Sequence, residues 1–163
     1  MQSWGAILCV IACALAGHEA SAQTAAMPMA RIQISPAQQV MFGAAQKVLQ
    51  RDYAGALALY NQAVAMDGTN VQAYLQRGVV KREMHDEAGA QADAAAAIRL
   101  CNAALARDPQ NAQLYHDRAL GFRLLKDFAH AREDMQRALQ LPGAQPGWKT
   151  DLRAIDLEEK FNG

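Results

Sequence analysis

The chain is poor in the residues that build β-sheets and in those that interrupt helices. Aromatic residues make up 6% of its 163 residues, and none of its five prolines lies between Pro36 and Pro109. β-Strands favour aromatic and β-branched side chains, whereas alanine, which is abundant here, is the strongest helix former. The length and an apolar content of 52% suit one ordinary core. The composition therefore predicts a single all-α domain.

The chain also lacks an excess of charge of either sign. Its sixteen basic residues balance sixteen acidic ones, and basic residues cluster no further than short steps such as Lys81-Arg82. Proteins that bind nucleic acid concentrate Lys and Arg in a stripe that neutralises phosphates. We therefore expect no nucleic-acid partner.

Sequence motifs for catalysis, phosphate binding and metal binding are missing as well. There is no glycine-rich phosphate loop and no HExxH spacing. Adjacent His and Asp residues on a helix point about 100° apart, so we expect surface histidines rather than a base with its orienting acid. We expect no enzyme, no cofactor and no metal site. The groups considered are His85 with Asp86, His116 with Asp117, His130 and Cys101.

The N-terminus resembles an export signal. An apolar run extends from Trp4 to Gly17 and is followed by the small residues Ala20 and Ala22, which suit signal peptidase. A membrane-spanning helix needs about 20 apolar residues, so the run is too short for a permanent anchor. No Lys or Arg precedes it, which departs from the usual signal. We expect residues 1–22 to be a signal peptide cleaved after Ala22, and the protein to be periplasmic or secreted.

An alternative for the leader is lipid attachment. Val10-Ile11-Ala12 before Cys13 loosely resembles the processing box of bacterial lipoproteins. Removal of residues 1–22 would leave Cys101 as the one cysteine, so that no intramolecular disulfide could form. Stability would then come from packing alone.

Residues 23–35 have no helical period and are expected to be a flexible linker. Ser35 and Pro36 then supply an N-cap residue and a proline at the first helical position, which predicts a folded domain over residues 36–163.

Three copies of one pattern follow within this domain. Small and bulky residues recur in steps of four and three, which places them on one stripe of a helix, and a Gly or Pro comes five residues later. Upstream of each stripe lies a pair of residues separated by one helical turn, which indicates a second helix. Each copy therefore consists of two helices. The stripes are Ala56, Tyr60, Ala63 with Gly68; Ala97, Cys101, Ala104 with Pro109; and Ala131, Met135, Ala138 with Gly143. The preceding pairs are Val40 with Ala44, Tyr74 with Gly78, and Tyr115 with Ala119.

This pattern resembles the tetratricopeptide repeat. The resemblance implies a right-handed α-solenoid of three helix pairs over residues 37–70, 71–111 and 112–145, closed by a capping helix over residues 147–161. We expect Trp148 to cover the end of the core; an exposed interface anchor is the alternative for this residue.

The middle pair is longer than the others. Tyr74 and Ala97 are twenty-three residues apart, whereas the same interval is sixteen in the other pairs. Seven residues are close to two helical turns, so they keep the buried stripe facing inward. We place the extension in the second helix, beginning near Asp86. Its alanines either cover neighbouring helices or offer a close-approach face to a partner helix; they are Ala88, Ala92, Ala94 and Ala95.

The resemblance also implies a concave groove, lined by the first helix of each pair, that accepts an extended or helical segment of a partner protein. Glutamine amides can bond a peptide backbone, and Arg82 and Arg123 can grip a carboxylate in bidentate fashion. The matching residues are Gln38, Met41, Gln72, Leu75, Val79, Arg82, Gln113, His116, Leu120 and Arg123.

The function expected is that of a non-catalytic adaptor or scaffold of the cell envelope that binds a protein partner. Two alternatives stay open: a structural component that assembles with copies of itself, and a lipid-anchored assembly factor. Polar residues on the outer side of the capping helix, Lys149, Arg153 and Lys160, argue against end-to-end stacking.

Overall fold

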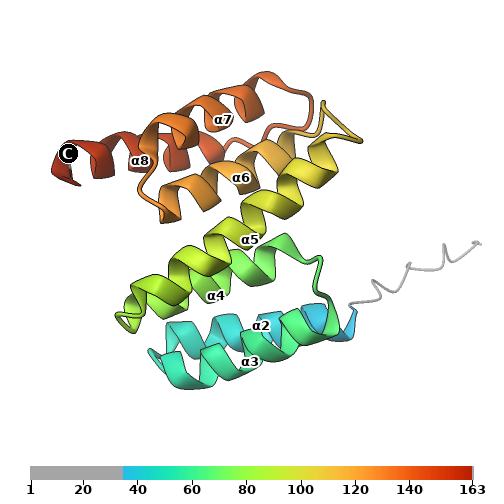
Figure 1. Cartoon of the computed structure of the whole chain (residues 1–163), viewed down its shortest axis with the longest axis vertical. Coiled ribbons are helices and arrows are strands. Elements are labelled where there is room, and N and C mark those ends of the chain that lie inside the picture. Colours follow the sequence, from blue (N-terminus) through green and yellow to red (C-terminus); the bar gives the residue numbers. More distant parts are fainter. Residues whose placement is uncertain (1–34, 163) are drawn as a thin grey trace, which may run out of the picture. The chain divides into compact units, whose positions relative to one another are not determined.

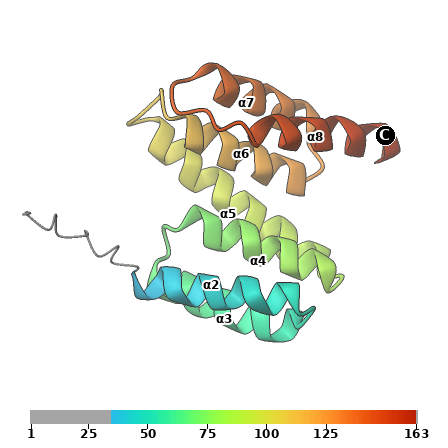
Figure 2. The ribbon, with the colours of Figure 1, turned by 180° about the vertical axis from the view of Figure 1, so that it is seen from behind.

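A computed structural model describes residues 35–162 of the chain, which lie within one compact unit, residues 34–163. The proposed leader and most of the linker fall outside the described residues. The described part contains seven α-helices and no β-strand, and Figures 1 and 2 show them from opposite sides. The helices are α2 (Pro36–Leu49), α3 (Tyr53–Met66), α4 (Val71–Glu83), α5 (Glu87–Leu105), α6 (Ala112–Leu124), α7 (Phe128–Gln140) and α8 (Trp148–Asn162).

A polar N-cap residue precedes the first residue of each helix from α2 to α7. The Ser35 hydroxyl oxygen accepts a hydrogen bond from the Gln38 backbone N–H, and the Gln38 side-chain oxygen accepts one from the Ser35 backbone N–H. Pro36 occupies the first turn, as the sequence predicts. Such caps satisfy N–H groups that have no partner within the helix. The caps of the next five helices are Asp52, Asn70, Asp86, Asn111 and Asp127.

The turn inside each helix pair has the same backbone geometry. Arg51, His85 and Lys126 precede the N-caps of α3, α5 and α7, with φ angles of 60°, 62° and 63°. Residues other than glycine adopt this left-handed conformation only at some cost in energy, so the packing of the two helices must hold it in place. The three helix pairs therefore share one type of turn.

Each helix packs against the next along the chain, and α4 also packs against α6. The described residues form a helical solenoid of three pairs followed by α8, which confirms the all-α prediction. Small residues allow the close approach of α4 and α6: a Cβ at Gly78 would lie 2.6 Å from Cδ2 of Leu124. Ala104 of the predicted stripes is half-buried, and the other stripe residues are buried: Ala56, Tyr60, Ala63, Ala97, Cys101, Ala131, Met135 and Ala138.

Helix α5 has 19 residues, against 14 in α3 and 13 in α7, and its N-cap is Asp86, so the lengthened helix lies where the sequence places it. When α5 and α3 are aligned at their N-caps, however, the residue of α5 that corresponds to Ala56 is Ala90 rather than Ala97. The added turns therefore extend the C-terminal end of α5, and the buried stripe continues through them. Of the alanines in question, Ala94 is buried, whereas Ala88 and Ala92 are exposed.

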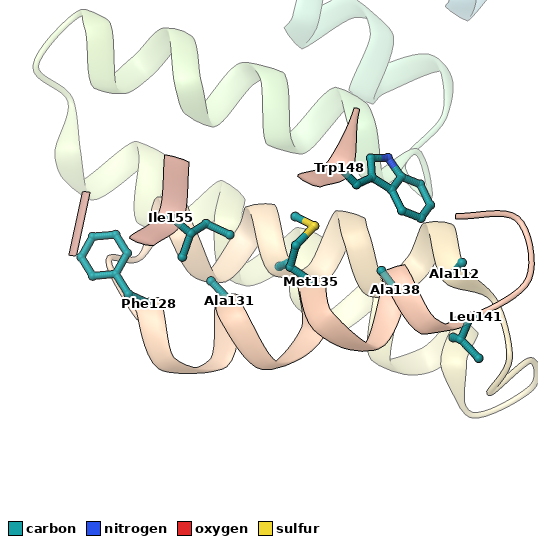
Figure 3. Packing of buried hydrophobic residues seen from close by; sticks show 9 residues of the cluster. Ala112, Phe128, Ala131, Met135, Ala138, Leu141, Trp148 and Ile155 are labelled. Atoms are coloured by element: carbon teal, nitrogen blue, oxygen red, sulfur yellow. The ribbon is translucent and has the colours of Figure 1, made fainter. Parts of the chain in front are cut away.

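Helix α8 covers the last pair. Figure 3 shows Trp148 and Ile155 lying along α7 on either side of Met135, over Ala131 and Ala138. Trp148 is 4% exposed, which confirms its predicted place over the core. Burial raises the pKa of the Cys101 thiol to about 12, as expected of a small apolar residue in the core rather than a nucleophile.

Candidate functional site

The predicted groove residues come from α2, α4 and α6, the first helices of the three pairs, and five of them line one pocket. This pocket has a volume of about 290 Å³. Leu75 and Leu124 are buried and Val79 and Leu120 half-buried, which gives it an apolar floor. The lining residues are Leu75, Gln76, Val79, Arg82, Leu120, Arg123, Leu124 and Asp151. The α2 residues Gln38 and Met41 are not among them.

The two arginines at the pocket differ in what they bind. The Arg123 guanidinium holds Glu158 of α8 through both carboxylate oxygens, with Nε at 3.0 Å from Oε2. This bonding lowers the pKa of Glu158 below its usual range and raises that of Arg123. Arg82 makes no hydrogen bond or ion pair with the described residues, although it lies near enough to Glu158 to help lower that pKa. Arg82 is therefore the cation available to an incoming carboxylate.

The predicted glutamines already have partners within the chain. The side-chain amides of Gln72 and Gln113 each donate to Oδ1 of Asp117 at 2.7 Å. Gln38 belongs to the cap of α2, and the Met41 sulfur accepts from Asn70 Nδ2 at 3.4 Å. A peptide backbone would have to replace these bonds to use the amides.

His116 is not the surface residue that the sequence suggested. It is 8% exposed; Nδ1 lies 3.3 Å from Oδ1 of Asp117 and Nε2 lies 3.0 Å from Oδ2 of Asp151. Its ring stacks on Trp148 with centroids 4.6 Å apart and planes inclined by 16°. The sequence argument failed because side-chain rotation brings neighbouring residues on one helix into contact, and because Asp151 comes from α8. With both ring nitrogens engaged, His116 fastens α8 to α6.

The pKa of His116 predicts that stability depends on pH. Burial opposes protonation, but hydrogen bonds to Asp117 and Asp151 outweigh it, so the pKa is raised above its ordinary value. Stability from the charged ring is therefore complete below the unfolded value of about 6.5 and is lost as pH rises through the folded pKa. We expect the urea midpoint to fall over this interval, and the fall to be smaller in His116→Gln.

The exposed His130, which pairs with Asp127, provides the control. His130→Gln should retain the full pH dependence of the wild type. If the two variants have the same pH profile, the dependence does not come from the contact between α6 and α8.

Sequence inspection missed a repeated cluster, built around a buried aspartate, that joins successive pairs. Arg77 of α4 donates to Asp93 of α5 and to Asn61 of α3. The same cluster recurs one pair later in Arg118, Asp134 and Asn102. In both clusters the Asn precedes the Arg, and the Arg precedes the Asp, by sixteen residues, a repeated spacing that could have revealed them.

Two classes of site are not found in the described part of the chain. It holds no group of three or more His, Cys, Asp or Glu side chains that could ligate a metal ion. None of its helices is long and apolar enough to cross a membrane.

No protein-family model matches the chain, and no curated protein matches it in sequence. Solved structures do match. The first TPR domain of human RPAP3 is 21% identical over 78% of this chain and 96% of that domain, with a TM-score of 0.52. The described residues have a tetratricopeptide-repeat fold. The Aspergillus fumigatus Sgt2 TPR domain, 19% identical over 79% of this chain and 84% of its own, also gives 0.52. So does the Yersinia enterocolitica type III secretion translocator chaperone SycD, 14% identical over 77% of this chain and 88% of its own.

Proposed function

We propose that the protein is a non-catalytic adaptor that binds a segment of another protein in the pocket between α4, α6 and α8. The observation that carries the proposal is an apolar floor beside Arg82, a cation without an ion pair in the described residues. A cavity of about 290 Å³ is of the size of one or two side chains. The ligand is thus an extended or helical segment that inserts an apolar side chain and presents a carboxylate to Arg82.

The test selects ligands from a display library of random peptides with the purified protein. We expect peptides that combine a large apolar residue with Asp or Glu, and we expect Arg82→Gln to weaken their binding about tenfold, as for loss of one charge-assisted hydrogen bond. Arg107→Gln is the matched control, because Arg107 is exposed beyond the end of α5 and outside the pocket. Failure to select any peptide, or equal binding by Arg82→Gln and wild type, would contradict the proposal.

The double substitution of Arg82 and Arg123, the obvious choice from the sequence, is less informative. Arg123→Ala would also leave Glu158 without its guanidinium partner and weaken the attachment of α8. Substitution of Arg82 alone separates ligand binding from stability.

We also propose that the adaptor works in the cell envelope or outside the cell. The support is the apolar run from Trp4 to Gly17 followed by Ala20-Ser21-Ala22. The intact mass of the protein from fractionated cells tests this: a chain that begins at Gln23 supports export, an acylated Cys13 supports the lipid-anchored alternative, and an uncleaved cytoplasmic chain contradicts both.

A further inference from the structure

The pocket between α4, α6 and α8 can be divided into two levels along its length. Two links join α8 to α6: His116 with Asp151, and Arg123 with Glu158. The partners of both links are 35 residues apart in the chain, so α8 runs beside α6 in the same direction (Figure 2). The links are seven residues apart on each helix, which corresponds to about 10.5 Å along the helix axis. Each link therefore marks one level of the pocket.

The level of Glu158 is the basic end of the pocket. Arg82 of α4 and Arg123 of α6 hold equivalent positions in successive helix pairs, and both line the pocket. Hydrogen bonds from Arg123 and the positive charge of Arg82 both lower the pKa of Glu158, which places the three groups together. One carboxylate faces two guanidinium groups here, so this end is positive.

The level of Asp151 is the acidic end. Asp151 lines the pocket, and its side chain is 37% exposed. His116 lies between Asp117 and Asp151, with one ring nitrogen near each carboxylate. Two carboxylates outnumber one imidazole whether or not the ring is protonated, so this end is negative. Within residues 35–162, His116 engages Oδ2 of Asp151 and no group donates to Oδ1, which is therefore available to a ligand.

Apolar side chains separate the two ends. Val79 of α4 and Leu120 of α6 are half-buried, line the pocket, and come about one helical turn before the arginines. A ligand that inserts an apolar side chain between Val79 and Leu120 thus has Arg82 on one side and Asp151 on the other.

We infer that the pocket binds a bipolar segment of the partner protein, in which a basic side chain and a carboxylate flank the apolar residue. The basic group faces Asp151 and the carboxylate faces Arg82. This inference rests on the proposed function and adds the sign and the order of the ligand's charges. Charge complementarity selects this occupant, because a segment with acidic groups on both sides would place one of them against Asp151. In an extended segment, which rises about 3.3 Å per residue, the two charged residues are about three or four residues apart.

Peptides selected by display on the wild-type protein provide the first test. We expect a basic and an acidic residue on opposite sides of the apolar residue, in one order throughout. Replacement of the basic residue by Gln should raise the Kd about threefold, the usual effect of one pair of partly exposed charges. Exchange of the two charged residues should raise it further, because like charges then meet at both ends. Isothermal titration calorimetry of the three synthetic peptides measures these values.

Asp151→Asn tests which residue receives the ligand's basic group. Asparagine keeps the size of the side chain and can still bond Nε2 of His116 through its amide. The variant should bind the selected peptide about threefold more weakly than wild type does. It should bind the Gln-substituted peptide as wild type does, because that peptide has no cation to face position 151.

Asp156→Asn is the matched control on the same helix. Asp156 pairs with Arg132 of α7 and lies outside the pocket, so this variant should bind both peptides as wild type does.

Three results would overturn this inference. They are selected peptides that depend on Arg82 but carry no basic residue, equal binding after the charged residues exchange places, and equal weakening of both peptides by Asp151→Asn, as a purely structural role of Asp151 would give. Each result leaves the proposed function intact, because the peptide still binds beside Arg82. Failure to select any peptide would contradict the proposed function and this inference together.

Discussion

Replacement of Trp148 by alanine is expected to lower the free energy of unfolding by about 3–5 kcal/mol, the usual cost of truncating a buried aromatic residue. Trp148 is 4% exposed, packs against the core of the last helix pair and stacks on His116. Figure 3 shows Trp148 and Ile155 of α8 lying over α7. The variant should therefore loosen α8 first.

The polar links between α7 and α8 cannot replace this packing. Arg132 pairs with Asp156 and Glu159, but these groups are half-exposed, and ion pairs that water reaches add little to stability. Urea unfolding should give the loss in stability, and amide hydrogen exchange should show faster exchange in residues 148–162 than in α4 or α6.

Leu157→Ala is the control on the same helix, because Leu157 is 54% exposed and an alanine there removes little buried surface. Its cost should stay below about 0.5 kcal/mol. Equal costs for the two variants, or exchange that rises equally in all helices of Trp148→Ala, would mean that α8 does not depend on Trp148.

The fold could be predicted from the sequence because its signals are local and repeated. The signals are alanine-rich stripes, a proline at the first position of α2, and turn residues before each helix. Each of them determines the backbone conformation within a few residues of its own position. Trp148 was placed over the core for the same reason: it begins an amphipathic helix after the last repeat.

The site was predicted less completely because its character depends on which side chains meet across helices. Register placed Arg82 and Arg123 in the groove, but only the three-dimensional arrangement shows that Glu158 of α8 already holds Arg123. The burial of His116 likewise depends on Trp148 and Asp151, which are more than thirty residues away in the chain.

Asp93 is the second position where a single substitution should have a large effect. Its carboxylate is 3% exposed and receives two cations: Arg77, with Nε at 2.9 Å and Nη2 at 2.5 Å, and Lys81, with Nζ at 2.9 Å. Both cations are themselves mostly buried. Asp93→Ala leaves them without their counter-ion, and loss of one partner of a buried ion pair costs about 3–5 kcal/mol.

The repeat supplies a graded comparison. Asp134 is buried in the equivalent cluster but, within residues 35–162, pairs with Arg118 alone, and Asp156 forms a half-exposed pair with Arg132. We expect the loss in unfolding free energy to decrease from Asp93→Ala to Asp134→Ala, and to be smallest in Asp156→Ala. Urea unfolding of the three variants measures this order.

The double variant Asp93→Ala, Arg77→Ala distinguishes a stranded charge from lost packing. If the loss of stability in Asp93→Ala comes mainly from buried cations left unpaired, removal of Arg77 as well should recover part of the stability. The remaining cation, Lys81, can reach solvent on its flexible stem. If the double variant is instead less stable by the sum of the two single losses, the cluster acts through packing. The buried carboxylate would then not be the feature that ties the second helix pair together.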